Sequence, residues 1–70
     1  MNMIPVDSSN LSAVGYDDSK ALMYIRLNSG RIYAYYNVPE NVHRELMNAT
    51  SLGSYFNSFI KGQYNDTKIG

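Results

Sequence analysis

The sequence has no cysteine, a single histidine and no excess of charge of either sign. Without cysteine the chain forms neither a disulfide nor a thiolate metal site, so its stability must come from one compact core. Six Lys and Arg against six Asp and Glu give a formal net charge of zero, which argues against a strong electrostatic footprint on a polyanion. The longest apolar run, residues 21–25, is far too short to span a membrane, and the first residues lack the pattern of a signal peptide. We therefore expect a cytoplasmic protein without a membrane partner.

What the chain has is a high content of core-forming residues for its size. It has 70 residues, of which 44% are hydrophobic, including seven tyrosines and two phenylalanines. That composition is typical of a folded chain, and the length allows one domain, residues 1–70. Residues 6–64 are expected to form its core, with 1–5 and 65–70 as loose ends.

The central stretch predicts antiparallel strands over residues 11–16, 21–27 and 31–36, the last two joined by the loop Asn28-Ser29-Gly30. A three-residue loop with Gly30 in the left-handed region is a common hairpin connection. It would bury one alternating set of side chains: Met23, Ile25, Leu27, Tyr33 and Tyr35. The opposite face would carry Leu22, Tyr24, Arg26, Ile32, Ala34 and Tyr36. An even-numbered loop would instead turn Tyr33 and Tyr35 outward with Arg26; Gly30 favours the first register.

After Asn37 the hydrophobic spacing becomes helical. One helix is expected from Val38, Val42, Leu46 and Ala49, with Pro39 as its first residue. Ser51 can cap a second helix whose apolar stripe is Leu52, Tyr55, Phe56, Phe59 and Ile60, and Gly62 is a natural end. We predict an α+β domain (βββαα), in which two short helices follow a three-stranded antiparallel meander and pack on one face of its sheet.

The polar residues form no constellation typical of catalysis. His43 has only Glu40 one helical turn away, which makes neither a general base with an oriented partner nor a closed metal site, so we interpret it as an exposed helical residue. Asp17 and Asp18 are adjacent in a turn, where their side chains splay apart. We therefore expect no enzymatic activity, no cofactor and no bound metal.

The exposed sheet face is the remaining candidate for function. Aromatic rings and guanidinium groups on a sheet can stack on unpaired bases. Stacking is assigned to Tyr24 and Tyr36, and contact with phosphate or base to Arg26, to Arg31 near the turn, and to Lys20 at the margin. Tyr and Arg are also enriched at the hot spots of protein interfaces, and an open edge strand can pair with another chain. An RNA surface and a protein-interaction or self-association surface both remain open.

An ordered set of short motifs resembles the KTSC domain, a family named for the C-terminal extension of some lysyl-tRNA synthetases and found also as free-standing bacterial and phage proteins. The motifs are 6–9 (Val-Asp-Ser-Ser), 14–16 (Val-Gly-Tyr), 29–30 (Ser-Gly), 33–35 (Tyr-Ala-Tyr), 38–39 (Val-Pro), 49–57, 60–61 (Ile-Lys) and Tyr64. The resemblance implies a small binding module, with RNA or tRNA as the ligand class and no catalytic residue. Relatives often carry a charged residue between the two tyrosines, which implies that Tyr33 and Tyr35 face inward; Ala34 makes the outer face of this chain less charged.

Overall fold

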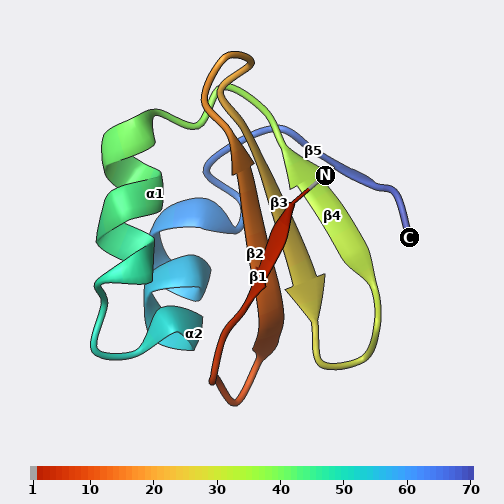
Figure 1. The fold of residues 1–70 in the computed structure, drawn as a ribbon, viewed down its shortest axis with the longest axis vertical. Helices are drawn as coiled ribbons and strands as arrows, with labels where there is room; N and C mark the ends of the chain where they lie inside the picture. The colour runs from red at the N-terminus through yellow and green to blue at the C-terminus, as the bar shows by residue number, and fades with distance from the viewer. Residues whose placement is uncertain (1) are drawn as a thin grey trace.

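The computed structural model describes residues 2–70 and shows a five-stranded antiparallel sheet whose spatial order follows the chain, β1-β2-β3-β4-β5. The strands are β1 (Met3–Pro5), β2 (Leu11–Asp17), β3 (Leu22–Leu27), β4 (Ile32–Tyr35) and β5 (Asp66–Lys68). Between β4 and β5 come α1 (Glu40–Met47), α2 (Leu52–Tyr55) and a π-helical segment, η1 (Phe56–Ile60). The helical segments lie on one side of the sheet, which leaves the other side open (Figure 1). The α+β class and the meander are confirmed.

The prediction of three strands was wrong, because both segments expected as loose ends contain a strand. β1 pairs with β2, with Ile4 opposite Val14, and β5 pairs with β4, with Thr67 opposite Ala34. These short outer strands satisfy backbone groups that β2 and β4 would otherwise present at open edges. Each has only three residues, too few for alternation of apolar side chains to mark it in the sequence.

The predicted hairpin register is confirmed. Met23 lies opposite Tyr35 and Ile25 opposite Tyr33. At the turn, the Leu27 N–H donates to the Arg31 carbonyl oxygen at 2.8 Å, and Gly30 has a φ of +97°. A residue without Cβ adopts that positive φ at little cost, which is why Gly30 allows an odd-length loop.

The core lies between the helices and the inner face of the sheet. Of the inward residues of the hairpin, Met23, Ile25 and Tyr35 are buried, whereas Leu27 and Tyr33 are half-buried. Tyr35 meets the Phe56 ring edge-on with a centroid separation of 5.6 Å. Nine buried side chains form the cluster: Leu11, Val14, Met23, Ile25, Tyr35, Val38, Leu46, Phe56 and Ile60. Burying this apolar area is the main source of stability for a small chain without disulfides.

The first helix is shorter than predicted and the second begins as predicted. Pro39 is the N-cap of α1 and not its first helical residue, and Ala49 lies beyond its end. Before α2, the Ser51 hydroxyl oxygen accepts a bond from the Ser54 N–H at 3.3 Å, which satisfies a free donor of the first turn. Gly62, with φ of +79°, follows η1 as the predicted end signal.

The predicted apolar stripe is wrong at one position, Phe59, whose side chain is 58% exposed. In η1 the Lys61 N–H donates to the carbonyl oxygen of Phe56, five residues earlier, at 2.8 Å. This wider turn rotates the later side chains relative to an α-helix. Phe56 and Ile60 therefore stay in the core, while Phe59 packs against Tyr55 with a centroid separation of 4.8 Å.

Candidate binding surface

Two of the predicted contact residues lie where we expected them, on the open face of β3. Arg26 is exposed, and Tyr24 is half-buried, opposite Ala34 on one side and Gly15 on the other. Tyr24 is the only aromatic residue of β1–β5 on that face. The face therefore offers one ring and one guanidinium group, fewer than a sheet platform that stacks several bases.

Lys20 and Tyr36 lie at the margin of this face. Lys20 is in the turn between β2 and β3 and lines a shallow hollow with Tyr24, Asp17 and Asp18. The Ser19 hydroxyl and backbone N–H both bond to the Asp17 carboxylate, and the hydroxyl contributes most to lowering the pKa of Asp17. Two carboxylates beside Lys20 reduce its attraction for an anion. Tyr36, 37% exposed, follows β4 and is tied to the start of β5 through its N–H, which donates to the Asn65 carbonyl oxygen.

The structure separates Arg31 from the other predicted contacts. Arg31 lies opposite Leu27, so its side chain shares the inner side of the sheet with Tyr33 and Tyr35. There it lines a hollow of about 290 Å³ between the hairpin and η1, to which Lys61 also contributes. The sequence contained the signal for this placement, because the period-two alternation that turns Tyr33 inward also turns Arg31 inward.

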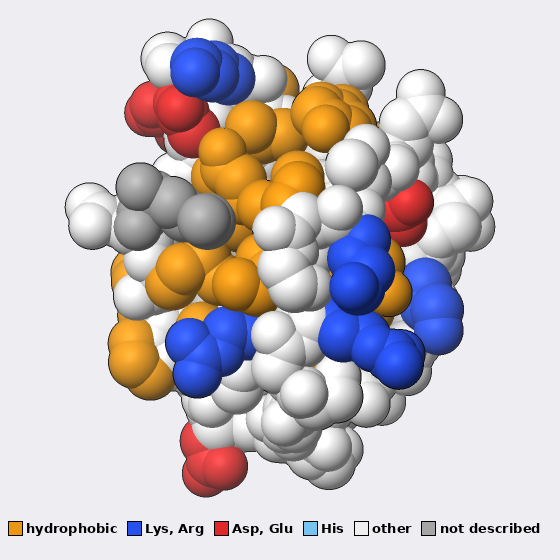
Figure 2. Space-filling model, turned by 90° about the vertical axis from the view of Figure 1, so that its right-hand side faces the viewer, with side chains coloured by type: hydrophobic (Ala, Val, Ile, Leu, Met, Phe, Trp, Pro, Cys, Tyr) orange, Lys and Arg blue, Asp and Glu red, His pale blue; other side chains and the backbone are white. Residues whose placement is uncertain are grey.

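The centre of the open face is built from small residues. Ala13, Gly15 and Ala34 are buried even though no helix covers them. A Cβ at Gly15 would lie 2.6 Å from the Asn2 carbonyl oxygen and 2.8 Å from the Met3 sulfur, so the start of the chain lies directly over this position. Figure 2 shows that hydrophobic side chains around this centre form a patch on the open face, with Lys and Arg side chains beside it.

Charge is distributed unevenly over the molecule. Four basic residues lie around one end of β3, β4 and β5, which we call the basic end: Arg26, Arg31, Lys61 and Lys68. Arg26 pairs with Ile32, next to Arg31, and Lys68 pairs with Tyr33 in the adjoining strand. One acid, Asp66, lines the same hollow as Arg31 and Lys61. Within residues 2–70, the one ion pair joins Arg44 to Glu40 on α1, with 3.0 Å between nitrogen and oxygen, so the basic end keeps its charges available.

His43 is half-buried in a packed contact, so our interpretation of it as an exposed helical residue was wrong. Its ring stacks on Tyr16 with centroids 4.5 Å apart and planes 8° apart. Burial lowers the pKa of His43, and the nearby Glu40 carboxylate partly opposes this. The Tyr16 hydroxyl donates to the Val38 carbonyl oxygen at 2.6 Å. His43 thus helps to fix α1 against β2.

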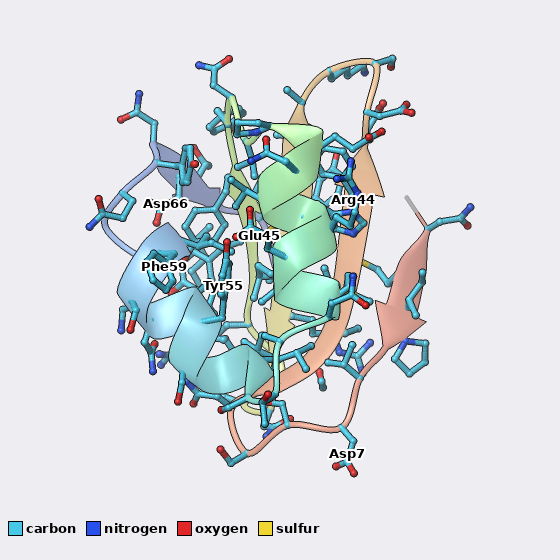
Figure 3. The ribbon with its side chains drawn as sticks, turned by 90° about the vertical axis from the view of Figure 1, so that its left-hand side faces the viewer. Asp7, Arg44, Glu45, Tyr55, Phe59 and Asp66 are labelled. Atoms are coloured by element: carbon cyan, nitrogen blue, oxygen red, sulfur yellow. The ribbon has the colours of Figure 1, made fainter. Side chains whose placement is uncertain are left out.

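A second phenol joins the two helical segments on their outer side. The Tyr55 hydroxyl donates to Glu45 Oε1 at 3.4 Å, and Figure 3 shows Glu45 on α1 directed toward Tyr55. Burial, followed by the Glu45 charge, raises the pKa of Tyr55. In the described residues 2–70, no group of three His, Asp or Glu side chains lies close enough to hold a metal, and no helix has the length and hydropathy to cross a membrane.

Known proteins similar to this chain show the family to which it belongs. The family described as the KTSC domain matches residues 7–64 of this chain. The chain belongs to the KTSC family. The crystal structure of a KTSC domain protein from Yersinia pestis matches with a TM-score of 0.96 and 36% identity, over 99% of this chain and 97% of that one.

Two sequence relatives show the two contexts in which the KTSC domain occurs. A protein of Tsukamurella paurometabola is 37% identical over 62 residues, which cover 89% of this chain and 92% of the relative. A lysine–tRNA ligase of a Nostoc species (strain PCC 7120) is 39% identical over 62 residues, again 89% of this chain but only 11% of the ligase. The KTSC domain thus occurs both as nearly a whole small protein and as a minor part of a tRNA ligase.

Proposed function

We propose that this KTSC protein is a non-enzymatic module that binds RNA, with tRNA or another RNA carrying unpaired bases as its ligand. The observation that supports this most is the basic end, where Arg26, Arg31, Lys61 and Lys68 gather on a chain of zero net charge. Similarity to a segment of lysine–tRNA ligases supports the same ligand class.

The basic end supplies the electrostatic part of such binding. Lys and Arg that neutralise phosphates release counterions, and this release accounts for much of the affinity of proteins for nucleic acids. Arg26, exposed on the open face, and Arg31, exposed at the hollow, lie on the two sides of the sheet at the same end. A strand that passes around this end of the hairpin can therefore reach both guanidinium groups.

Aromatic side chains beside the basic end supply the contribution to RNA binding that does not depend on salt. Tyr24 lies two residues from Arg26 on the open face, and Tyr33 lies two residues from Arg31 on the inner side. A base stacked on an aromatic ring contributes about 1–3 kcal/mol. With only one ring on each side, we expect contact with one or two unpaired bases and modest affinity.

The test is a titration of fluorescently labelled tRNA and of a short unpaired RNA, measured by anisotropy over a series of salt concentrations. The affinity should fall as salt rises, and Arg26→Gln or Arg31→Gln should each reduce the slope of log K against log salt by about 0.7 for a single strand. Arg44→Gln is the matched control, since Arg44 is paired with Glu40 on α1. Absence of binding at low salt would overturn the proposal, as would equal effects of all three substitutions.

A self-association module is the second candidate, and the hydrophobic patch on the open face favours it (Figure 2). Exposed apolar patches on small proteins often mark contacts with other proteins. Ile69, 48% exposed, follows β5 and bonds through its N–H to the Ile32 carbonyl oxygen, so another large apolar side chain is accessible beside the sheet. Sedimentation of the isolated protein distinguishes this candidate: a mass that rises with concentration supports it, and a monomer at high concentration argues against it.

A further inference from the structure

The hollow between the hairpin and η1 has an apolar floor and a polar rim. The floor consists of buried or half-buried side chains: Leu27, Tyr33, Tyr35 and Phe56. Tyr35 and Phe56 meet edge-on there, so the floor is largely aromatic. A volume of about 290 Å³ lies just below the usual range for small-molecule sites, about 300–1,000 Å³, and suits a ligand of one ring system with one attached group.

The rim carries both charge and amide groups, all exposed. Arg31 comes from the hairpin turn, Lys61 and Asn57 from η1 and its end, and Asn10 from the loop before β2. The Asn28 N–H in the hairpin turn donates to the Asn10 carbonyl oxygen at 2.9 Å, which holds this loop beside Arg31. Segments distant in the sequence are thus held around one opening.

A hydrogen-bonding group also lies at the floor. Burial and, after it, the charge of the neighbouring Asp66 carboxylate raise the pKa of Tyr35 to about 12. A carboxylate has about four lone-pair sites, so Asp66 keeps acceptor capacity for a donor group of a ligand. The Asn57 amide, which lines the same hollow, offers both a donor and an acceptor.

We propose that this hollow receives the base of one unpaired nucleotide, with its phosphate on Arg31 and Lys61 and its hydrogen-bonding edge toward Asn57 and Asp66. An aromatic floor suits the face of a base, two cations suit a phosphate, and an amide beside a carboxylate suits a base edge that carries an amino group. Because Asp66 only accepts, cytosine should bind more tightly than uracil, which has carbonyl oxygens on both sides of its N–H.

Binding of a base that belongs to an RNA chain rests on the RNA-binding function proposed above. Binding of a free nucleotide to the hollow can be tested separately. The first arm titrates isotope-labelled protein with cytidine and uridine 5′-monophosphates and follows it by NMR. Shifts confined to the hollow, above all of the Asn57 side-chain amide, are expected, together with weaker binding of the uridine compound. Shifts dispersed over the open face, or equal binding of the two nucleotides, would overturn this assignment.

The second arm uses oligocytidylate and the variant Asn57→Ala, with Asn41→Ala on the exposed surface of α1 as the matched control. Asn57→Ala should weaken binding about tenfold without changing the salt slope, because it removes edge contacts but no charge. Asn41→Ala should leave both quantities unchanged. Equal affinities of the two variants would overturn the nucleotide site while the RNA-binding function stood. If the unmodified protein bound cytidine monophosphate in the hollow but bound no RNA, the RNA-binding function would be overturned and the nucleotide site would stand.

Discussion

The two faces of the sheet bury their residues in different ways. On the inner face, large side chains such as Met23, Ile25 and Tyr35 are at most 3% exposed, because α1, α2 and η1 cover them. On the open face, Ala13 and Ala34 are nearly as buried without any helix above them. Small side chains are shielded there by larger neighbours and by the start of the chain, so little of the centre of this face is accessible.

This difference indicates where a ligand can bind. A face with small residues at its centre and one half-buried ring, Tyr24, is not an extended stacking platform. The inner side, by contrast, opens at the basic end into a hollow with an aromatic floor. The residues available for recognition therefore lie at one end of the hairpin, on both sides of the sheet, and not across the middle of the open face.

The largest effect should come from removing an aromatic side chain from the inner side. Phe56→Ala is expected to lower the free energy of unfolding by about 3–5 kcal/mol, because the Phe56 ring is 3% exposed and leaves a cavity beside Tyr35. Urea denaturation monitored by circular dichroism measures this loss. A domain of this size has a total stability of about 5 kcal/mol, so the variant is close to unfolding.

Phe59→Ala, three residues later, is the matched control. Phe59 is 58% exposed and contacts Tyr55, so its loss should cost less than about 1 kcal/mol. Equal losses for the two variants would contradict the rotation of side chains that η1 produces. The two variants also test the outward position of Phe59, which the spacing of apolar residues alone predicts incorrectly.

Much of the inner face was predictable, because its signals are local. Gly30 indicated the loop length, and the loop length determined that Tyr33 and Tyr35 face the core. Ser51 marked the start of α2 through a cap that depends on neighbouring residues only. These features follow from turn chemistry and from side-chain period, which a short stretch of sequence contains.

The rest depends on contacts between distant segments. β1 and β5 exist because β2 and β4 offer backbone partners, and β5 lies more than 30 positions after β4. The hollow is lined by residues of the hairpin, η1 and the loop before β2. Because these segments are distant in the sequence, no motif of adjacent residues predicts it. Arg31 is the exception: the confirmed register implied its inward side, and our grouping of Arg31 with Tyr24 and Arg26 overlooked this.

The open face can be tested at Gly15. Gly15→Ala should lower the free energy of unfolding by about 1–3 kcal/mol, because the new methyl group would collide with the Asn2 carbonyl oxygen and the Met3 sulfur and force β1 to shift. Hydrogen exchange should be faster at the β1 amides and unchanged in β3 and β4. Gly53→Ala in α2 is the control, since the nearest atom, Ser8 Oγ at 3.3 Å, belongs to a side chain that can move. If Gly15→Ala cost less stability than Gly53→Ala, this would contradict the close approach of Asn2 and Met3 to Gly15.

The smallest effect concerns the pH dependence of the inner side. Tyr35 has a pKa of about 12 in the folded protein, first because it is buried and second because Asp66 is near, against an ordinary value of 10.0. The folded state therefore holds this proton more tightly than the unfolded state, and its contribution to stability is complete below pH 10 and is lost as the pH rises from 10 toward 12. The pKa values of Tyr16 and Tyr55 are also raised, but that of Tyr35 is raised most, so ultraviolet absorbance should show Tyr35 as the last of these phenols to ionise. Urea denaturation should show a stability that falls over the same range. Tyr35→Phe should remove the last ionisation and most of this fall in stability. Asp66→Asn should move the ionisation of Tyr35 only part of the way back toward pH 10, since burial, the largest cause, remains. If the stability of Tyr35→Phe fell between pH 10 and 12 as steeply as that of the unmodified protein, the pH dependence would belong to another tyrosine and the burial of Tyr35 would not be its cause.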